Sequence, residues 1–210
     1  MQKITFRLIG QSPLIQHNIQ MANPLNKYSK FMKPLTGKRQ KTDTDLMEIS
    51  RIEWEGGIYL GSESNGLAGK VILPGRCLDA CFFAGAKKKK TGEKWRTGVF
   101  FDADEYILDY KGIKINIKET KEIPNPELDK HFDSHKYQVM VRVGTSQVLR
   151  TRPIFHDWSV EATLLYDENI VDTRTLGQIA EDAGYLVGLC DRRPGSKGGG
   201  SFGRFIVEII

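Results

Sequence analysis

The chain begins with a regular alternation of polar and apolar residues, which is typical of a strand with one buried face. Within residues 2–10, Ile4, Phe6 and Leu8 lie on one side, and charged or polar residues lie on the other. Similar patterns predict further strands, some of them short, within 58–60, 71–73, 99–118, 137–143, 154–166 and 202–210.

Two long segments instead repeat their apolar residues at helical spacing. The first runs from residue 76 to about 88, and its stripe consists of Leu78, Cys81, Phe82 and Ala86. The second runs from a cap at Asp172-Thr173 to Leu189, and a shorter helix over 43–54 follows Thr42. Residues 19–42 and 119–136 are rich in charged residues and proline, and we expect both to be loops.

The strongest elements follow the order strand, helix, strand, strand, helix, strand. This order predicts an α+β protein with a ferredoxin-like antiparallel sheet and two helices on one of its faces. The other face would remain open for a ligand or partner. We expect a single domain over residues 1–210, with large insertions at about 16–57 and 87–136.

Charge is unevenly distributed over the 210 residues, although the net charge is only +5. Residues 1–100 contain 17 Lys/Arg and 8 Asp/Glu, whereas residues 101–210 contain 14 and 18. A basic face of this kind attracts polyanions and raises their association rate. The three cysteines lack a disulfide framework and no signal-peptide pattern is seen, so we expect a cytoplasmic protein. No apolar run is long enough to predict a membrane span.

The most informative segment is the tail, Gly188–Phe205, which joins the second long helix to the last strand. It contains six glycines and four cations, Arg192, Arg193, Lys197 and Arg204. Glycine permits positive φ and close backbone approach, and successive exposed N–H groups form anion-binding concavities. The tail therefore favours a phosphate-binding loop; the alternative is a flexible connection with solvated charges.

Two short motifs within this element order resemble the RAMP superfamily, the RNA-binding proteins of CRISPR effector complexes. They are Leu73-Pro74-Gly75-Arg76 at the start of a helix and the glycine-rich tail before the last strand. The closest similarity is to the backbone subunit that polymerises along the guide RNA. The tail also resembles small bacteriophage proteins, and its Gly-Gly-Gly-Ser-Phe-Gly ending departs from the usual glycine-hydrophobic-glycine pattern.

The resemblance implies binding of single-stranded nucleic acid by several subunits in a row or within a ribonucleoprotein. It favours RNA, but the sequence leaves RNA and DNA both open. It also implies a segment that reaches over the strand, for which 20–42 and 87–98 are the candidates. Both are basic and contain aromatic residues that can stack on bases. The cations and the aromatic residue assigned to this site are Lys38, Arg39, Lys41, Lys87, Lys88, Lys89, Lys90, Trp95 and Arg96.

Further candidates are single residues or pairs. Arg76, in the first turn of its helix, opposes the helix dipole and so favours an anion contact. Arg150 and Arg152 either clamp consecutive phosphates or are exposed charges at a strand end. His131 and His135 are more consistent with a solvated loop than with a metal site, and we expect no metal and no cofactor.

Two other functions remain open from the sequence. One is a metal-independent endoribonuclease that uses His17 as its general acid or base, since RNA-cleaving relatives in this superfamily use a histidine. The other is a phage protein that mimics or inhibits a CRISPR complex through protein contacts. RNA cleavage in EDTA, or protein binding without nucleic-acid binding, would distinguish them.

Overall fold

The computed structural model describes residues 1–117 and 122–210. Internal contacts divide the chain into two compact units. Unit 1 consists of Met1–Ile15, Val71–Lys111 and Phe155–Ile210, and unit 2 consists of Gln16–Lys70 and Gly112–Ile154. Unit 2 begins at residue 16, where the first insertion was expected, but residues 87–111 belong to unit 1.

Unit 1 is built on a four-stranded antiparallel sheet with the strand order β4-β8-β1-β9. Its strands are β1 (Gln2–Gly10), β4 (Val99–Phe101), β8 (Ser159–Tyr166) and β9 (Phe205–Ile209). The central strand β1 pairs with β8 through Ile4 and Leu164 and with β9 through Leu8 and Val207. A short pair, β3 (Ile72–Pro74) with β5 (Glu105–Ile107), and the two-residue strand β2 (Leu14–Ile15) complete its strands in the described residues.

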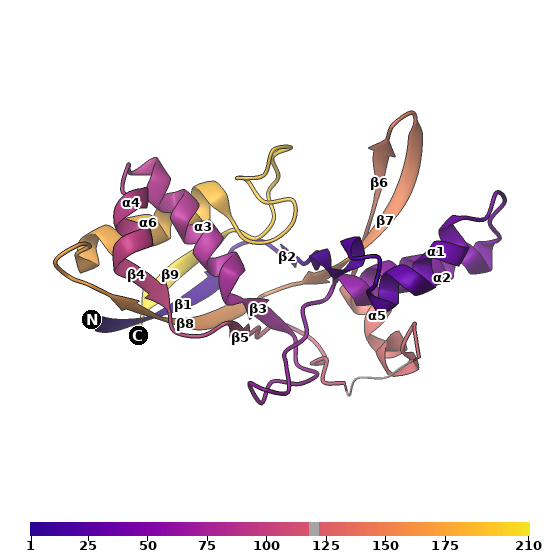
Figure 1. Ribbon diagram of the computed structural model, residues 1–210, viewed down its shortest axis with the longest axis horizontal. Helices are drawn as coiled ribbons and strands as arrows, with labels where there is room; N and C mark the ends of the chain where they lie inside the picture. Colours follow the sequence, from indigo (N-terminus) through magenta and orange to yellow (C-terminus); the bar gives the residue numbers. More distant parts are fainter. Residues whose placement is uncertain (118–121) are drawn as a thin grey trace. The chain divides into compact units, whose positions relative to one another are not determined.

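Helices cover one face of this sheet, as Figure 1 shows. They are α3 (Gly75–Lys88), α4 (Gly92–Gly98) and α6 (Thr173–Asp182), which continues as a π-helical turn, Ala183–Val187. Ile4, Phe6 and Leu8 of β1 are buried on this side, and the ring of Phe6 stacks 6.1 Å from that of Phe82. The alternation along β1 therefore places the core between the sheet and α3.

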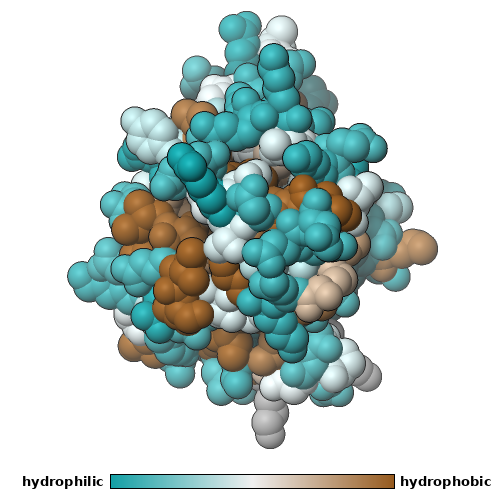
Figure 2. Space-filling model, turned by 90° about the vertical axis from the view of Figure 1, so that its left-hand side faces the viewer, coloured by the Kyte–Doolittle hydropathy of each residue, from teal (hydrophilic) through white to brown (hydrophobic). Residues whose placement is uncertain are grey.

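The opposite face of the sheet carries both polar and apolar side chains. The Arg7 guanidinium forms a 2.7 Å ion pair with Glu161, and the Thr5 hydroxyl lies 3.0 Å from that of Thr163. Exposed apolar side chains share this face, including Phe100, which pairs with Leu165, and Ile206, which pairs with Ile9. Figure 2 shows such brown patches on the side of the molecule where the termini lie in Figure 1.

Unit 2 contains a helix pair and a long hairpin. The helices are α1 (Lys27–Thr36) and α2 (Asp43–Gly57), which share a small core of Tyr28, Leu35, Ile52 and Ile123. The hairpin pairs β6 (Lys136–Val143) with β7 (Ser146–Phe155) through a two-residue turn in which Gly144 has φ 62°. The remaining described helices are short: α5 (Asp129–His135) and the 3-10 turns η1 (Ile19–Ala22) and η2 (Pro126–Leu128).

Several predicted elements are confirmed, with shifted ends. The strand over 2–10 and the helix over 76–88 are present as β1 and α3, and the helix over 43–54 continues to Gly57. The predicted strand 154–166 is divided, because Asp157 adopts φ 45° between β7 and β8.

The loops predicted at 19–42 and 119–136 are wrong for most of their length. Residues 27–36 form α1 because Tyr28 and Leu35 fall on one side of a helix and the Asn26 side chain caps its first turn. In the second segment, residues 118–121 lie outside the described part of the chain, and residues 126–135 form η2 and α5. The strand predicted over 58–60, and the C-terminal part of the strands predicted within 99–118, are reduced to isolated bridges.

Candidate nucleic-acid interface

The tail between α6 and β9 is a folded loop that doubles back on its own backbone. The Phe202 N–H donates to Arg192 O, the Leu189 N–H donates to Gly203 O, and the Gly195 N–H donates to Val187 O. A Cβ at Gly200 would lie 1.8 Å from Arg192 O, and one at Gly203 would lie 2.1 Å from Leu189 O. The glycines therefore permit two chain segments to lie in direct backbone contact.

This tail loop lies against the first half of α3. The Cys81 thiol of α3 donates to Gly188 O at 3.2 Å, and the Cys190 thiol hydrogen-bonds that of Cys77. Pro74, the N-cap residue of α3, provides no side-chain cap to the N–H groups of the first turn. The structure thus brings the predicted Arg76 contact and the predicted tail arginines to the same end of α3.

The tail cations differ in how firmly they are held. The Arg193 guanidinium donates to Cys190 O at 2.7 Å and is half-buried, so it braces the loop. The Arg204 Nε donates to Ser201 O at 3.3 Å. Lys197 is exposed at the loop tip, and within the described residues it forms no ion pair. Arg192 adopts φ 52° and is half-buried beside Asp191, whose carboxylate accepts its backbone N–H.

A second group of cations occupies the C-terminal end of α3 and the start of α4. The Lys87 ammonium and the Arg96 guanidinium lie 4.6 Å and 4.4 Å from the centre of the Phe83 ring. Lys89 forms a 3.5 Å ion pair with Asp182. Lys88 and Lys90 are exposed at the end of the helix, where cations are favoured by its dipole.

Trp95 does not have the role that the sequence suggested. Its side chain is 1% exposed, its ring lies 5.6 Å from that of Phe82, and its indole N–H donates to Asp79 Oδ1 at 2.9 Å. Both its faces and its polar atom are used inside unit 1. The prediction that Trp95 stacks on bases is therefore corrected: it anchors α4 to α3.

Arg150 and Arg152 are also corrected, because both face the buried carboxylate of Glu53. Arg150 forms an ion pair with Glu53, the Arg152 guanidinium lies 4.0 Å from it, and the Thr151 N–H donates to Glu53 at 2.9 Å. Glu53 is 4% exposed. These arginines join the hairpin to α2 within unit 2. They are therefore neither a clamp for consecutive phosphates nor exposed charges at a strand end.

The remaining basic residues assigned from the sequence lie between α1 and α2. The Lys38 ammonium forms a 2.6 Å ion pair with Asp45, and hydrogen bonds from Lys38 and from the Thr42 backbone hold the pKa of Asp45 below its usual value. The Lys41 ammonium donates to Lys38 O at 2.9 Å, and Arg39 is exposed. The positive charge of the segment between α1 and α2 is therefore partly neutralised by Asp45.

The histidines lie in different surroundings. His17 is exposed, and its carbonyl oxygen accepts a hydrogen bond from the Tyr59 hydroxyl at 3.1 Å. His131 and His135 are buried on α5 with their rings 6.4 Å apart, so their assignment to a solvated loop is wrong. Burial, with the nearby Lys130 and His135, lowers the pKa of His131.

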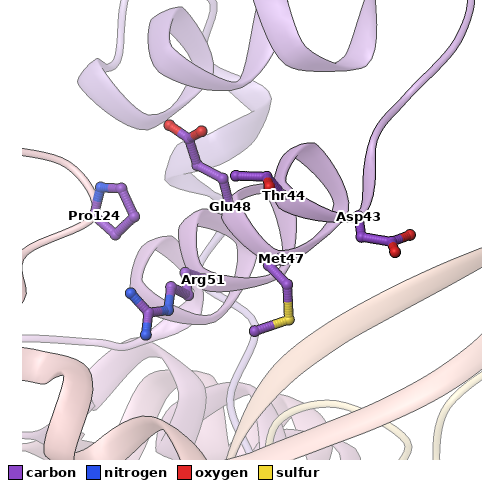
Figure 3. Close-up of a pocket in the computed structure, with 6 residues that line it drawn as sticks. All are labelled: Asp43, Thr44, Met47, Glu48, Arg51 and Pro124. Atoms are coloured by element: carbon purple, nitrogen blue, oxygen red, sulfur yellow. The ribbon is translucent and has the colours of Figure 1, made fainter.

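One pocket of unit 2 lies on the outer side of α2, as Figure 3 shows. It is lined by Asp43, Thr44, Met47, Glu48, Arg51 and Pro124. The carboxylates of Asp43 and Glu48 point away from each other, and Arg51 forms a 3.0 Å ion pair with Asp129. The lining side chains do not converge on one point, so the pocket offers no evident chemistry.

Within residues 1–117 and 122–210, no group of three or more His, Cys, Asp or Glu side chains is placed to hold a metal ion. In the same residues, none of the helices combines the length and apolar composition needed to cross a bilayer. Neither the protein-family models nor the curated proteins provide a match to this chain.

The sequence reasoning missed two features of this region. One is Phe83, whose ring carries two cations; its spacing of four residues from Lys87 on a predicted helix was the available signal. The other is the contact between Cys77 and Cys190, which are too far apart in the chain for any local pattern to connect them.

Proposed function

We propose that this protein binds single-stranded nucleic acid, RNA in preference to DNA, mainly through the phosphate backbone. The tail loop and the N-terminal end of α3 form the principal contact region. The cations at the C-terminal end of α3 form a second one. The preference for RNA, and assembly of several copies along a strand or within a larger ribonucleoprotein, rest on the RAMP resemblance.

The order of elements in unit 1 supports a ferredoxin-like core for this function. Along the chain, β1, α3, β4, β8, α6 and β9 alternate as strand, helix, strand, strand, helix and strand. In the sheet, the first strand lies between the third and the fourth, and the second strand lies at the edge beside the third. This strand order, with helices on one face of the sheet, supports the proposed split βαβ arrangement.

The observation that carries the proposal is the packing of the tail loop against the first turns of α3. The first turn of α3 has no side-chain cap, although the Gly75 N–H donates to Asp104 O at 2.7 Å. Arginines near this helix end, beside a loop with glycine-enforced backbone turns, combine features that bind phosphate. The positive charge of Arg76 lies at the positive N-terminal end of the α3 dipole, which is unfavourable. A bound anion would offset this repulsion. Backbone and guanidinium donors of this kind recognise phosphate without reading base identity.

The two cationic regions lie at opposite ends of α3. A helix of 14 residues is on the order of 20 Å long, so a single extended strand of several nucleotides would be needed to reach both regions. A strand too short to span α3 would contact one region at a time. Affinity is therefore expected to rise steeply with oligonucleotide length.

The test is affinity for labelled single-stranded RNA and DNA oligomers at two salt concentrations. Replacing Arg192 and Arg193 with alanine should weaken binding to all sequences and reduce the salt slope by about 0.7 for each phosphate that the protein no longer neutralises. Replacing Lys88 and Lys90 should have a smaller effect of the same kind. The matched control, Lys3→Ala with Arg174→Ala, removes two exposed cations of unit 1 outside both regions and should leave affinity nearly unchanged.

Equal reductions in affinity in the control and in the tail variant would reduce the proposal to general charge attraction. Absence of binding to either polymer, with retention of a protein partner, would favour the protein-contact function instead. Cleavage of RNA in EDTA that His17→Ala abolishes would assign the endoribonuclease function.

A further inference from the structure

We infer that Cys77 and Cys190 form a reversible disulfide that fastens the tail loop to α3, and hence that the proposed phosphate-binding site is regulated by oxidation. The regulatory part rests on the proposed function, whereas the cross-link itself does not. Cys77 lies in the first turn of α3 and Cys190 in the tail loop, 113 positions further along the chain. Their thiols hydrogen-bond each other in the reduced protein.

The surroundings of the three cysteines separate this pair from the third thiol. Cys77 and Cys190 are half-buried, so small oxidants can reach them. Cys81 is 4% exposed, and its thiol donates to Ala183 O at 3.4 Å and to Gly188 O at 3.2 Å. Cys81 thus differs from the pair in its deeper burial and in its two hydrogen bonds to backbone carbonyls, and the Cys77–Cys190 contact does not include it.

The chemistry requires an oxidant of the hydroperoxide class. One thiolate displaces water from hydrogen peroxide to give a sulfenic acid, and the second thiol then attacks that sulfur and releases a second water. Two thiols and one peroxide thus yield one disulfide and two waters. The hydrogen bond with Cys77, together with burial, raises the pKa of Cys190 well above its usual value. The reaction should therefore be slow near neutrality and faster in alkaline solution.

The effect of the cross-link depends on the contacts that hold the tail loop in the reduced protein. The reduced loop depends on backbone hydrogen bonds and on the bond from Arg193 to Cys190 O. A disulfide to α3 would restrict opening of residues 189–203 and hold the tail loop against the first turns of α3. Preorganisation of this kind strengthens binding by lowering the ordering cost.

The first measurement needs no nucleic acid. The fully reduced protein is treated with hydrogen peroxide or diamide, free thiols are titrated, and the digest is searched for a Cys77–Cys190 linked peptide. We expect titratable thiols to fall from three to one, faster at alkaline pH, and reducing agent to restore all three. Hydrogen exchange over 189–203 should be several-fold slower in the oxidised form.

Three variants serve as controls. Cys77→Ser and Cys190→Ser should each abolish the linked peptide, whereas Cys81→Ser should retain it. Retention of three thiols in excess oxidant, or links that involve Cys81 or two chains, would overturn the inference. A disulfide that forms in a protein with no affinity for RNA in either state would leave the cross-link standing and remove the proposed function. Given binding, the oxidised form should bind RNA several-fold more tightly, and equal or weaker binding would overturn the regulation.

Discussion

Arginine side chains have different partners in the tail loop of unit 1 and in the Arg150–Arg152 segment of unit 2. In unit 2, a buried carboxylate, Glu53, accepts an ion pair from Arg150 and a backbone N–H from Thr151. In the tail loop, Arg193 donates to a backbone carbonyl instead, and its charge is not neutralised by that bond. The difference teaches that a buried carboxylate engages the arginines of unit 2, whereas a backbone carbonyl holds Arg193 in the tail loop.

The comparison is tested most strongly by Glu53→Ala. This change would leave Arg152 and the Thr151 N–H without their carboxylate inside unit 2, and removal of one partner from a buried ion pair destabilises by about 3 kcal/mol. Chemical denaturation would measure the effect. If Glu53→Ala left stability unchanged, Arg150 and Arg152 would again be candidates for phosphate binding.

A smaller effect is expected from Gly203→Ala in the tail loop. Gly203 has φ 66°, and an added Cβ would lie 2.1 Å from Leu189 O, so the loop must open or shift at a cost of about 2 kcal/mol. The matched control is Gly198→Ala, because nothing lies within 4 Å of its added Cβ. Denaturation midpoints of the two variants check this. Equal stability would mean that the loop is not held by close backbone contact.

The smallest effect is a pH dependence of stability that arises in unit 2, where His131 is buried. Its pKa is lowered in the folded state, so the unfolded chain binds more protons as the pH falls below about 6.5. Stability should therefore decline as the pH falls from 6.5 towards the lowered folded pKa, and it should recover on return to neutral pH.

Comparing denaturation curves of the wild type and His131→Phe from pH 5 to 7 isolates this contribution, since Glu55 also titrates within unit 2. The buried Glu55 carboxyl has a raised pKa, mainly through burial, and acts in the opposite direction. A pH dependence that survives in His131→Phe would assign it to other groups.

The sequence was sufficient for elements whose local pattern agrees with their burial. The alternation in β1 and the apolar stripe of α3 predicted both elements to within one residue, because each buries one regular face. α1 was missed because lysines and Pro34 interrupt its packed apolar positions, Tyr28, Met32 and Leu35, and its stability depends on packing against α2. The short α5 was missed for the same reason.

Only part of the candidate site was predicted, because tertiary contacts decide which of its residues remain accessible. A glycine and arginine count identified the tail, but only the fold shows that Glu53 engages Arg150 and Arg152 and that Trp95 is buried by Phe82. Arg150 and Glu53 are 97 positions apart, and Trp95 meets Phe82 only because α4 folds back on α3. Local spacing carries no information about these contacts.

The most direct test of the account is ultraviolet cross-linking of photoreactive single-stranded RNA to the intact protein, with the attached peptides identified by mass spectrometry. The account predicts cross-links within residues 188–204 and within 76–96, and none within 146–155. Cross-links concentrated in 146–155, with the tail peptides unmodified, would contradict it.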